Sequence, residues 1–223
     1  MLNLGLFYIS QRDFIRAEEL LQECLETRKR VLGPEHPDTI NSHYNIIALR
    51  NAEGNIPEAS RLTVQLLQDH TKPVVEFLRA QKQFASAEAL VKIRINHLTK
   101  ENGPSHASTL AAIDILAQLY QSQDKYTDSE LLIRQNLETR KQTLGPHHED
   151  TLASMYKLGL VLWLQDRYDA SERVFFEALE IRRKVFGGQH EKTKELVDVI
   201  VACYQSVGRF DDGDELRAKY STL

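Results

Sequence analysis

The sequence contains few cysteines and no long apolar segment. Its two cysteines, Cys24 and Cys203, stand far apart in the 223 residues, each within a helical pattern. This arrangement predicts no disulfide framework and favours a reducing compartment. No apolar run approaches the roughly 20 residues of a membrane span, and no secretory signal opens the chain. We therefore expect a cytoplasmic protein that does not associate with a membrane.

The sequence also has no large excess of positive or negative charge. The chain has 28 basic and 32 acidic residues, mixed along its length, for a net charge of -4. A nucleic-acid-binding protein needs a basic patch or stripe, and this sequence has none. With 42% apolar and 27% charged residues, the composition is that of an ordinary globular protein. We expect no nucleic-acid partner.

The signatures of common catalytic sites are also missing. The sequence has no G-x-x-x-x-G-K-[ST] phosphate-binding loop and no G-x-S-x-G nucleophile turn. Its carboxylates are scattered over the faces of predicted helices, where charge usually means solvated surface. Cys24 aligns with a small core residue, Ala178, which predicts a buried cysteine and not a nucleophile. We therefore expect no enzyme, no catalytic residue and no cofactor.

The sequence does contain a loop that recurs four times. Each copy has a glycine, a histidine three residues later and a threonine six residues later. The glycines are separated by 70, 42 and 42 residues. A fixed period of this size is typical of a helical repeat array. The four copies span 32–39, 102–109, 144–151 and 186–193.

Each loop is expected to join two helices. After the loop at Gly145 we expect a helix over 151–164, a short turn and a second amphipathic helix over 168–185. Thr151 is predicted to be the N-cap of the first of these helices, with Asp150 placing negative charge at its positive end. The glycine is predicted to end the preceding helix in the left-handed conformation, and the proline after it cannot continue that helix.

Six second helices align on a bulky residue that is followed three residues later by a small one. The bulky residues step by 42, 28, 42, 42 and 42, so the third repeat is 14 residues shorter than its neighbours. We expect the bulky residue to fill the turn between two helices and the small residue to let them approach closely. The first helix of the shortened repeat is expected to cover only about 73–81. The aligned residues are Phe14 and Ala17, Ile56 and Ala59, Phe84 and Ala87, Tyr126 and Ser129, Tyr168 and Ser171, and Phe210 and Gly213.

The histidines of the four loops have two interpretations. They could form a metal-binding row, or each could satisfy backbone groups within its own loop. Neighbouring repeats lie on the order of 20 Å apart, whereas zinc–nitrogen bonds are about 2 Å long. The four side chains therefore cannot share one ion, and we expect no metal site. These histidines are His36, His106, His148 and His190.

The aligned residues resemble the tetratricopeptide repeat. The fifth repeat carries that family's pattern at Leu158, Gly159, Leu162, Ser171, Phe175 and Ala178. The 42-residue period and the recurring loop resemble the kinesin-light-chain subtype, and similar arrays occur as C-terminal sensor arrays of NOD-like receptors. The resemblance implies an all-α fold, a right-handed superhelical solenoid of about six helix-turn-helix repeats. We expect one array over 1–223, a fragment of a longer protein, with repeats near 1–31, 39–70, 72–100, 109–143, 151–185 and 193–221.

In this family the first helices line a concave groove that binds peptides. The resemblance places amides, a few charged residues and some aromatic residues at those positions, a mixture that suits an extended peptide. Few of them are Lys or Arg, which argues against the carboxylate clamp of chaperone-binding members. Trp163 has an alternative role in packing between repeats. The implied groove residues are Asn41, Tyr44, Asn51, Glu76, Arg79, Asp114, Gln118, Gln121, Tyr156, Trp163, Asp198 and Gln205.

These observations favour a scaffold for protein–protein interaction, which binds a peptide or protein partner in the groove without catalysis. The alternative is a sensor or regulatory array at the C-terminus of a NOD-like (NB-ARC type) signalling ATPase, whose nucleotide-binding domain this sequence does not carry. Self-association through the end repeats is a third interpretation.

Overall fold

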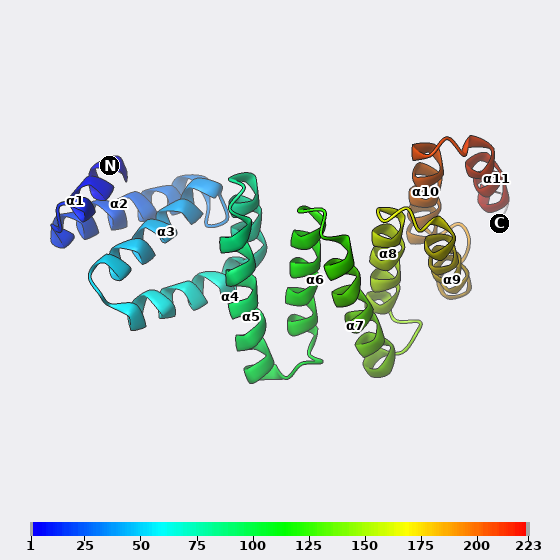
Figure 1. Cartoon of the computed structure of the whole chain (residues 1–223), viewed down its shortest axis with the longest axis horizontal. Helices are drawn as coiled ribbons and strands as arrows, with labels where there is room; N and C mark the ends of the chain where they lie inside the picture. Colours follow the sequence, from blue (N-terminus) through cyan, green and yellow to red (C-terminus); the bar gives the residue numbers. More distant parts are fainter. Residues whose placement is uncertain (1, 222–223) are drawn as a thin grey trace. The chain divides into compact units, whose positions relative to one another are not determined.

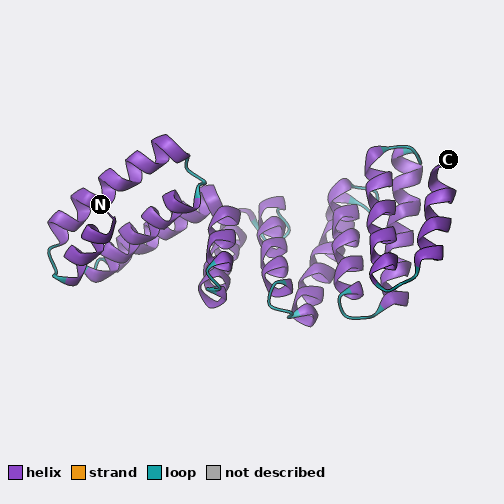
Figure 2. Ribbon diagram, turned by 90° about the horizontal axis from the view of Figure 1, so that it is seen from above, coloured by secondary structure: helices purple, strands orange, loops and turns teal. Residues whose placement is uncertain are grey.

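The structure, a computed structural model, describes residues 2–221 apart from the side chains of Asp69 and Ser221. These residues form α-helices joined by short loops, with no strand among them (Figure 2). The all-α prediction is therefore confirmed. The helices are α1 (Leu2–Ser10), α2 (Phe14–Leu32), α3 (Pro37–Ala52), α4 (Ile56–Ala80), α5 (Phe84–Asn102), α6 (Ala107–Gln121), α7 (Tyr126–Leu144), α8 (Glu149–Trp163), α9 (Tyr168–Phe186), α10 (Glu191–Ser206) and α11 (Phe210–Ser221).

Helix α4 is two helices that meet at a kink. His70, at the kink, has φ -139° and ψ 35°, which is not a helical conformation, and Pro73 follows in the first turn beyond it. With α4 counted as two parts, 56–69 and 71–80, the described residues form six helix pairs, as the sequence predicts. The first helices of the pairs are α1, α3, the second part of α4, α6, α8 and α10.

The shortened third repeat explains why α4 is continuous apart from its kink. Elsewhere a second helix of 19 residues is followed by a loop and a first helix of 15 or 16 residues. Helix α4 fits both helices into 25 residues. The shortening therefore removes the loop and about one turn from each helix. The expected short helix at 73–81 is present as 71–80.

The chain divides into two compact units at the loop after α5. The first unit, Met1–Gly103, contains α1 to α5, and the second, Pro104–Leu223, contains α6 to α11. Within each unit every helix packs against the next one along the chain, as Figure 1 shows for α6 to α11. Such nearest-neighbour packing is the arrangement of a helical repeat array.

The recurring loop caps the helix that follows it, but with a different residue from the predicted one. His148 is the N-cap of α8, because its Nδ1 accepts the backbone N–H of Asp150 at 3.2 Å. Thr151 lies inside the helix, where its hydroxyl donates to the carbonyl oxygen of Gly145 at 2.8 Å. The prediction that Thr151 is the N-cap is therefore wrong, whereas Asp150 does lie in the first turn. The interpretation that the loop histidines satisfy local backbone groups is confirmed in all four loops.

The loop glycines have a conformation that other residues essentially avoid. Gly33, Gly103, Gly145 and Gly187 have φ between 90° and 95° and ψ between 157° and 164°. This region is open almost only to glycine. The predicted need for glycine is thus confirmed, but the predicted left-handed helical conformation is wrong, because ψ is extended.

The small residue of each second helix is buried, which agrees with its predicted place at the contact with the partner helix. In the fifth pair the Ser171 hydroxyl donates to the carbonyl oxygen of Gly159 at 2.7 Å, which shows how closely α8 and α9 approach. Between the two helices of each pair, the chain changes direction at one residue whose φ lies between 58° and 79°. Gly54 and Gly208 are glycines, whereas the other four are Arg12, Lys82, Asp124 and Asp166, so no common residue type marks the turn. The buried small residues are Ala17, Ala59, Ala87, Ser129, Ser171 and Gly213.

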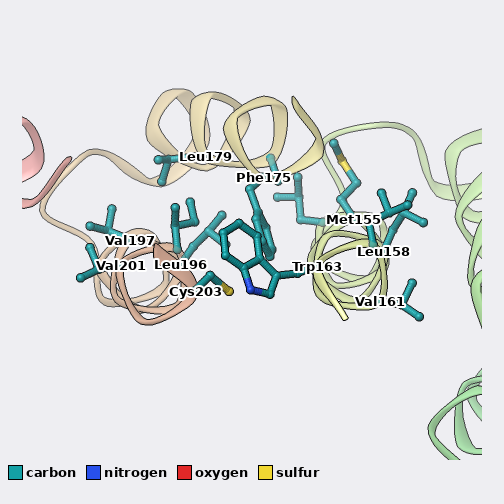
Figure 3. Close-up of a cluster of buried hydrophobic side chains, with 14 of the residues drawn as sticks. Met155, Leu158, Val161, Trp163, Phe175, Leu179, Leu196, Val197, Val201 and Cys203 are labelled. Atoms are coloured by element: carbon teal, nitrogen blue, oxygen red, sulfur yellow. The ribbon is translucent and has the colours of Figure 1, made fainter. Parts of the chain in front are cut away.

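The core of the second unit is built around Phe175. Its ring fills the space beside Gly159, where an added Cβ would lie 2.4 Å from the ring. Phe175 is 1% exposed and lies in one cluster with Met155, Leu158 and Leu179 (Figure 3). The contact between α8 and α9 therefore depends on a large residue facing a glycine.

Candidate functional site

The surface that the resemblance implicates is the exposed side of the first helices, which we call the first-helix face. In the first unit it belongs to α3 and the second part of α4. In the second unit it belongs to α6, α8 and α10. The common loop fixes where each of α3, α6, α8 and α10 begins, so their side chains recur at equivalent positions.

Two predicted groove residues of the first unit line one cavity. Tyr44 and Asn51 of α3 border a cavity of about 260 Å³, together with Leu66 of α4 and Leu90 of α5. The Tyr44 ring stacks on Phe77, with centroids 6.1 Å apart. Burial raises the pKa of Tyr44, so its hydroxyl stays protonated. The lining is mainly apolar, which suits an apolar side chain.

Two predicted groove residues of the second unit also share a cavity. Tyr156 of α8 and Asp198 of α10 border a cavity of about 480 Å³ with Arg182 and Glu195. The Arg182 guanidinium donates to the carbonyl oxygen of Lys192. Burial lowers the pKa of Arg182 and raises the pKa of Tyr156. This cavity therefore offers charges of both signs beside an aromatic ring.

Asp114 of α6 is not available at the surface. It is 7% exposed, and its carboxylate accepts hydrogen bonds from three side chains. These are Asn136 Nδ2 at 2.8 Å, Arg140 Nη2 at 3.0 Å and Lys157 Nζ at 2.7 Å. Because Asn136 and Arg140 belong to α7 and Lys157 to α8, one carboxylate joins three helices. Asp114 holds two successive repeats together, and we leave it out of the binding surface proposed below.

Trp163 is also a core residue. It is 8% exposed, and its ring lies 4.5 Å from Tyr168 and 6.1 Å from Tyr204 between centroids. Its indole Nε1 donates to the Ser206 hydroxyl at 3.3 Å. Figure 3 shows the indole among the core side chains between α8 and α10. This buried position agrees with the alternative role of Trp163, packing between repeats. Trp163 is therefore also left out of the binding surface proposed below.

The other predicted groove residues lie outside these two cavities. The amides of Gln118, Gln121 and Gln205 form no side-chain hydrogen bond with the described part of the chain, so they are free to bond a partner. Asn41 and Gln121 are half-buried, and Glu76, Arg79, Gln118 and Gln205 are exposed.

Comparison with known families decides what kind of repeat this is. The tetratricopeptide repeat family matches residues 1–38, 109–184 and 152–212. The chain belongs to the tetratricopeptide repeat family. Tetratricopeptide repeat arrays generally bind protein partners and are typically non-catalytic. No curated protein matches the chain.

Solved structures similar to this tetratricopeptide repeat array are of the kinesin-light-chain type. The crystal structure of BtubC (BKLC) from P. vanneervenii matches with a TM-score of 0.58 and 15% identity, over 95% of this chain and 89% of that chain. A putative kinesin light chain from Podosopora anserina matches with a TM-score of 0.50 and 20% identity, over 82% of this chain and 92% of that chain. At these identities the likeness shows the fold alone.

A set of arginines in the second helices of the tetratricopeptide repeats was not predicted from the sequence. Arg28, Arg140 and Arg182 occupy equivalent positions, and each donates a hydrogen bond to the start of the next helix. The signal was present, because the pentapeptide Leu-Glu-Thr-Arg-Lys at 25–29 and 137–141 contains the first two of them. The acceptors are the carbonyl oxygen of Asp38 at 2.9 Å, the Ser154 hydroxyl at 2.5 Å and the carbonyl oxygen of Lys192.

Within 2–221, no group of three His, Cys, Asp or Glu side chains is placed to hold a metal ion. Cys24 and Cys203 are free and buried. Burial raises the pKa of Cys203 to about 11, which disfavours the thiolate that a nucleophile requires. No helix of the described chain is long and apolar enough to cross a membrane.

Proposed function

We propose that this tetratricopeptide repeat array is a scaffold that binds an extended peptide segment of a protein partner on its first-helix face. The observation that carries this proposal is the set of side chains that remain available there. The amides of Asn51, Gln118 and Gln121 form no side-chain hydrogen bond with other described residues. Amides can pair with the backbone groups of an extended chain.

Each unit has one cavity that can receive a side chain of a bound peptide. The cavity at Tyr44 is mainly apolar and suits an apolar anchor, whereas the cavity at Tyr156 combines an aromatic ring with charged groups. A few well-filled pockets carry most of the binding energy in protein interfaces. We therefore expect the cavities to bind side chains of the peptide and to supply most of the affinity, whereas the amides hydrogen-bond to the backbone of the peptide.

Removing the amides is expected to weaken partner binding without unfolding the array. In the variant with Asn51→Ala, Gln118→Ala and Gln121→Ala, we expect the affinity for a captured partner to fall about tenfold or more, since each lost hydrogen bond contributes about 0.5–1.5 kcal/mol. Capture from a cell lysate, followed by titration of the purified partner, measures this effect.

A matched variant on the second helices controls for general loss of surface polarity. Glu19, Gln135 and Arg173 are exposed, lie on α2, α7 and α9, and have no side-chain partner in the described chain. Their replacement by alanine is expected to leave binding unchanged. If this control loses the partner while the amide variant retains it, the partner binds the second helices and the proposal is wrong.

A regulatory array within a larger signalling ATPase of the NOD-like type is a second candidate. The specific support is α1, where Leu4, Leu6 and Phe7 are 48%, 39% and 54% exposed. An apolar helix face of this kind suits packing against another domain. The coding sequence upstream of this segment tests the candidate. A phosphate-binding loop there would support it, and the absence of a nucleotide-binding domain would contradict it.

A further inference from the structure

The four interrepeat loops place a histidine at the same position in the same role. In each loop the imidazole Nδ1 accepts the backbone N–H of the residue two positions later, in the first turn of α3, α6, α8 or α10. The backbone at all four histidines is extended, with φ between -68° and -64° and ψ between 139° and 145°. The distances are 3.2 Å for His36, 3.3 Å for His106, 3.2 Å for His148 and 3.2 Å for His190.

Histidine is an unusual N-cap because its acceptor nitrogen no longer accepts a hydrogen bond once it is protonated. Serine, threonine, asparagine and aspartate are the usual residues at this position. An imidazole nitrogen accepts a hydrogen bond only while it carries no proton, and both nitrogens become donors in the cation. Imidazole groups change protonation between about pH 5 and pH 8. Protonation at Nδ1 would remove the cap and place a positive charge at the positive end of a helix dipole.

We propose that the four histidine caps make this array sensitive to mild acid, so that α3, α6, α8 and α10 lose their N-terminal anchors together as the pH falls below neutrality. The inference does not depend on the proposed peptide binding. It concerns the same helices, however, because these four carry most of the first-helix face. Stability in a repeat array is a sum over repeats and their interfaces, so four equivalent losses add.

Two caps have a carboxylate close to the imidazole. Asp38 Oδ2 lies 4.0 Å from Nδ1 of His36, and Asp150 Oδ2 lies 3.7 Å from Nδ1 of His148. Glu149, next to His148, is exposed and bonds to Lys192 of α10. If the imidazole is protonated, each aspartate forms a weak exposed ion pair with it, which offsets part of the loss of the cap.

The other two caps have no carboxylate within ion-pair distance among the described residues. His106 Nδ1 lies 2.8 Å from the Ser108 hydroxyl. The His190 ring stacks on Phe186, with centroids 5.0 Å apart, and the Lys192 ammonium lies 5.6 Å from the same Phe186 ring. A second positive charge at His190 would be repelled by Lys192. These two caps should therefore lose most on protonation.

Two other histidines lie beside carboxylates, and their contribution must be separated from that of the caps. His97 lies 3.0 Å from Glu101, and His70 lies 3.9 Å from Glu35, so protonation creates ion pairs at both sites. A variant with His36→Asn, His106→Asn, His148→Asn and His190→Asn leaves them in place. Asparagine is a favoured N-cap that does not titrate, so this variant keeps the caps and removes only their response to pH.

The test is the thermal midpoint of the parent chain and of the four-asparagine variant, measured by circular dichroism from about pH 8 to about pH 5.5. We expect the parent midpoint to fall by about 5–15 °C, because four caps are lost together and the loss of each lowers the midpoint of a domain of this size by about 2–4 °C. The variant midpoint should change by less than about a third as much. Equal falls in parent and variant would overturn the proposal.

Two further measurements keep the test decisive. His147 is exposed and adjacent to His148 but caps no helix, so His147→Asn should retain the full fall of the parent. Long-range nitrogen–proton NMR of the imidazoles reports their tautomers without any variant. The proposal requires the proton on Nε2 in all four cap histidines at about pH 8. A proton on Nδ1 at that pH would overturn it even if the asparagine variant fails to fold.

Discussion

Replacing Asp114 with alanine is expected to lower the free energy of unfolding by about 3–5 kcal/mol, the usual cost of removing one partner of a buried ion pair. The side chains of Asp114 and Arg140 are only 10% and 8% exposed, and they meet at 3.0 Å. Without the carboxylate, Arg140 would keep its charge in the interior, with the Ser154 hydroxyl as its one remaining hydrogen-bond partner among the described residues. Asn136 and Lys157 would lose a hydrogen bond as well.

Asp198 provides a matched control for this substitution. It occupies the position equivalent to Asp114 two repeats later, but its side chain is 68% exposed and lies 3.8 Å from Arg217. We expect Asp198→Ala to change the free energy of unfolding by less than about 0.5 kcal/mol, as exposed ion pairs contribute little. Urea denaturation of both variants measures the difference. Similar losses for the two would show that the three-helix network at Asp114 does not stabilise the fold.

Replacing Phe175 with alanine is expected to cost about 3–5 kcal/mol of unfolding free energy. Phe175 is 1% exposed, and its ring occupies the space that a Cβ at Gly159 would need. The substitution would leave a cavity between α8 and α9, and the backbone of two helices limits how far it can close. The loss should appear in the urea midpoint and as cooperative unfolding at a lower temperature.

The neighbouring Phe176 separates this effect from a general loss of aromatic area. Phe176 is half-buried and borders a shallow cavity with Tyr204 and Leu216. Because much of its ring already meets solvent, Phe176→Ala should cost about half as much or less. A larger loss from Phe176→Ala than from Phe175→Ala would mean that the packing of α8 on α9 has been assigned to the wrong residue.

The helix pairs could be predicted because their signals repeat along the chain. In the second helix of each pair, a bulky residue is followed three residues later by a small one. Helix packing requires a small residue wherever two backbones approach closely, as at Ser171 and Gly159. The N-cap was predicted wrongly because propensity favours Thr151 over His148. The N-cap lies three residues earlier than propensity suggests, and the Thr151 hydroxyl bonds the carbonyl oxygen of Gly145 instead of capping the helix.

The candidate site could be predicted only as a set of positions. Asp114, Tyr156 and Asp198 are equivalent in the repeat, yet one is buried in an ionic network, one lines a cavity and one is exposed. Asp114 is buried because Arg140 and Lys157 surround it, whereas the residue equivalent to Lys157 in the next repeat is Val199, beside Tyr156. Burial at each position depends on side chains from neighbouring helices, and repeat alignment alone does not supply that information.

The most direct test of the proposed binding surface is site-specific photocrosslinking to a captured partner. A photoreactive phenylalanine analogue is placed at Gln118 on α6 or at Gln135 on α7, both of which are exposed. If the partner binds the first-helix face, a covalent adduct forms from position 118 and not from position 135. An adduct from position 135 alone would place the partner on the second helices and contradict the account.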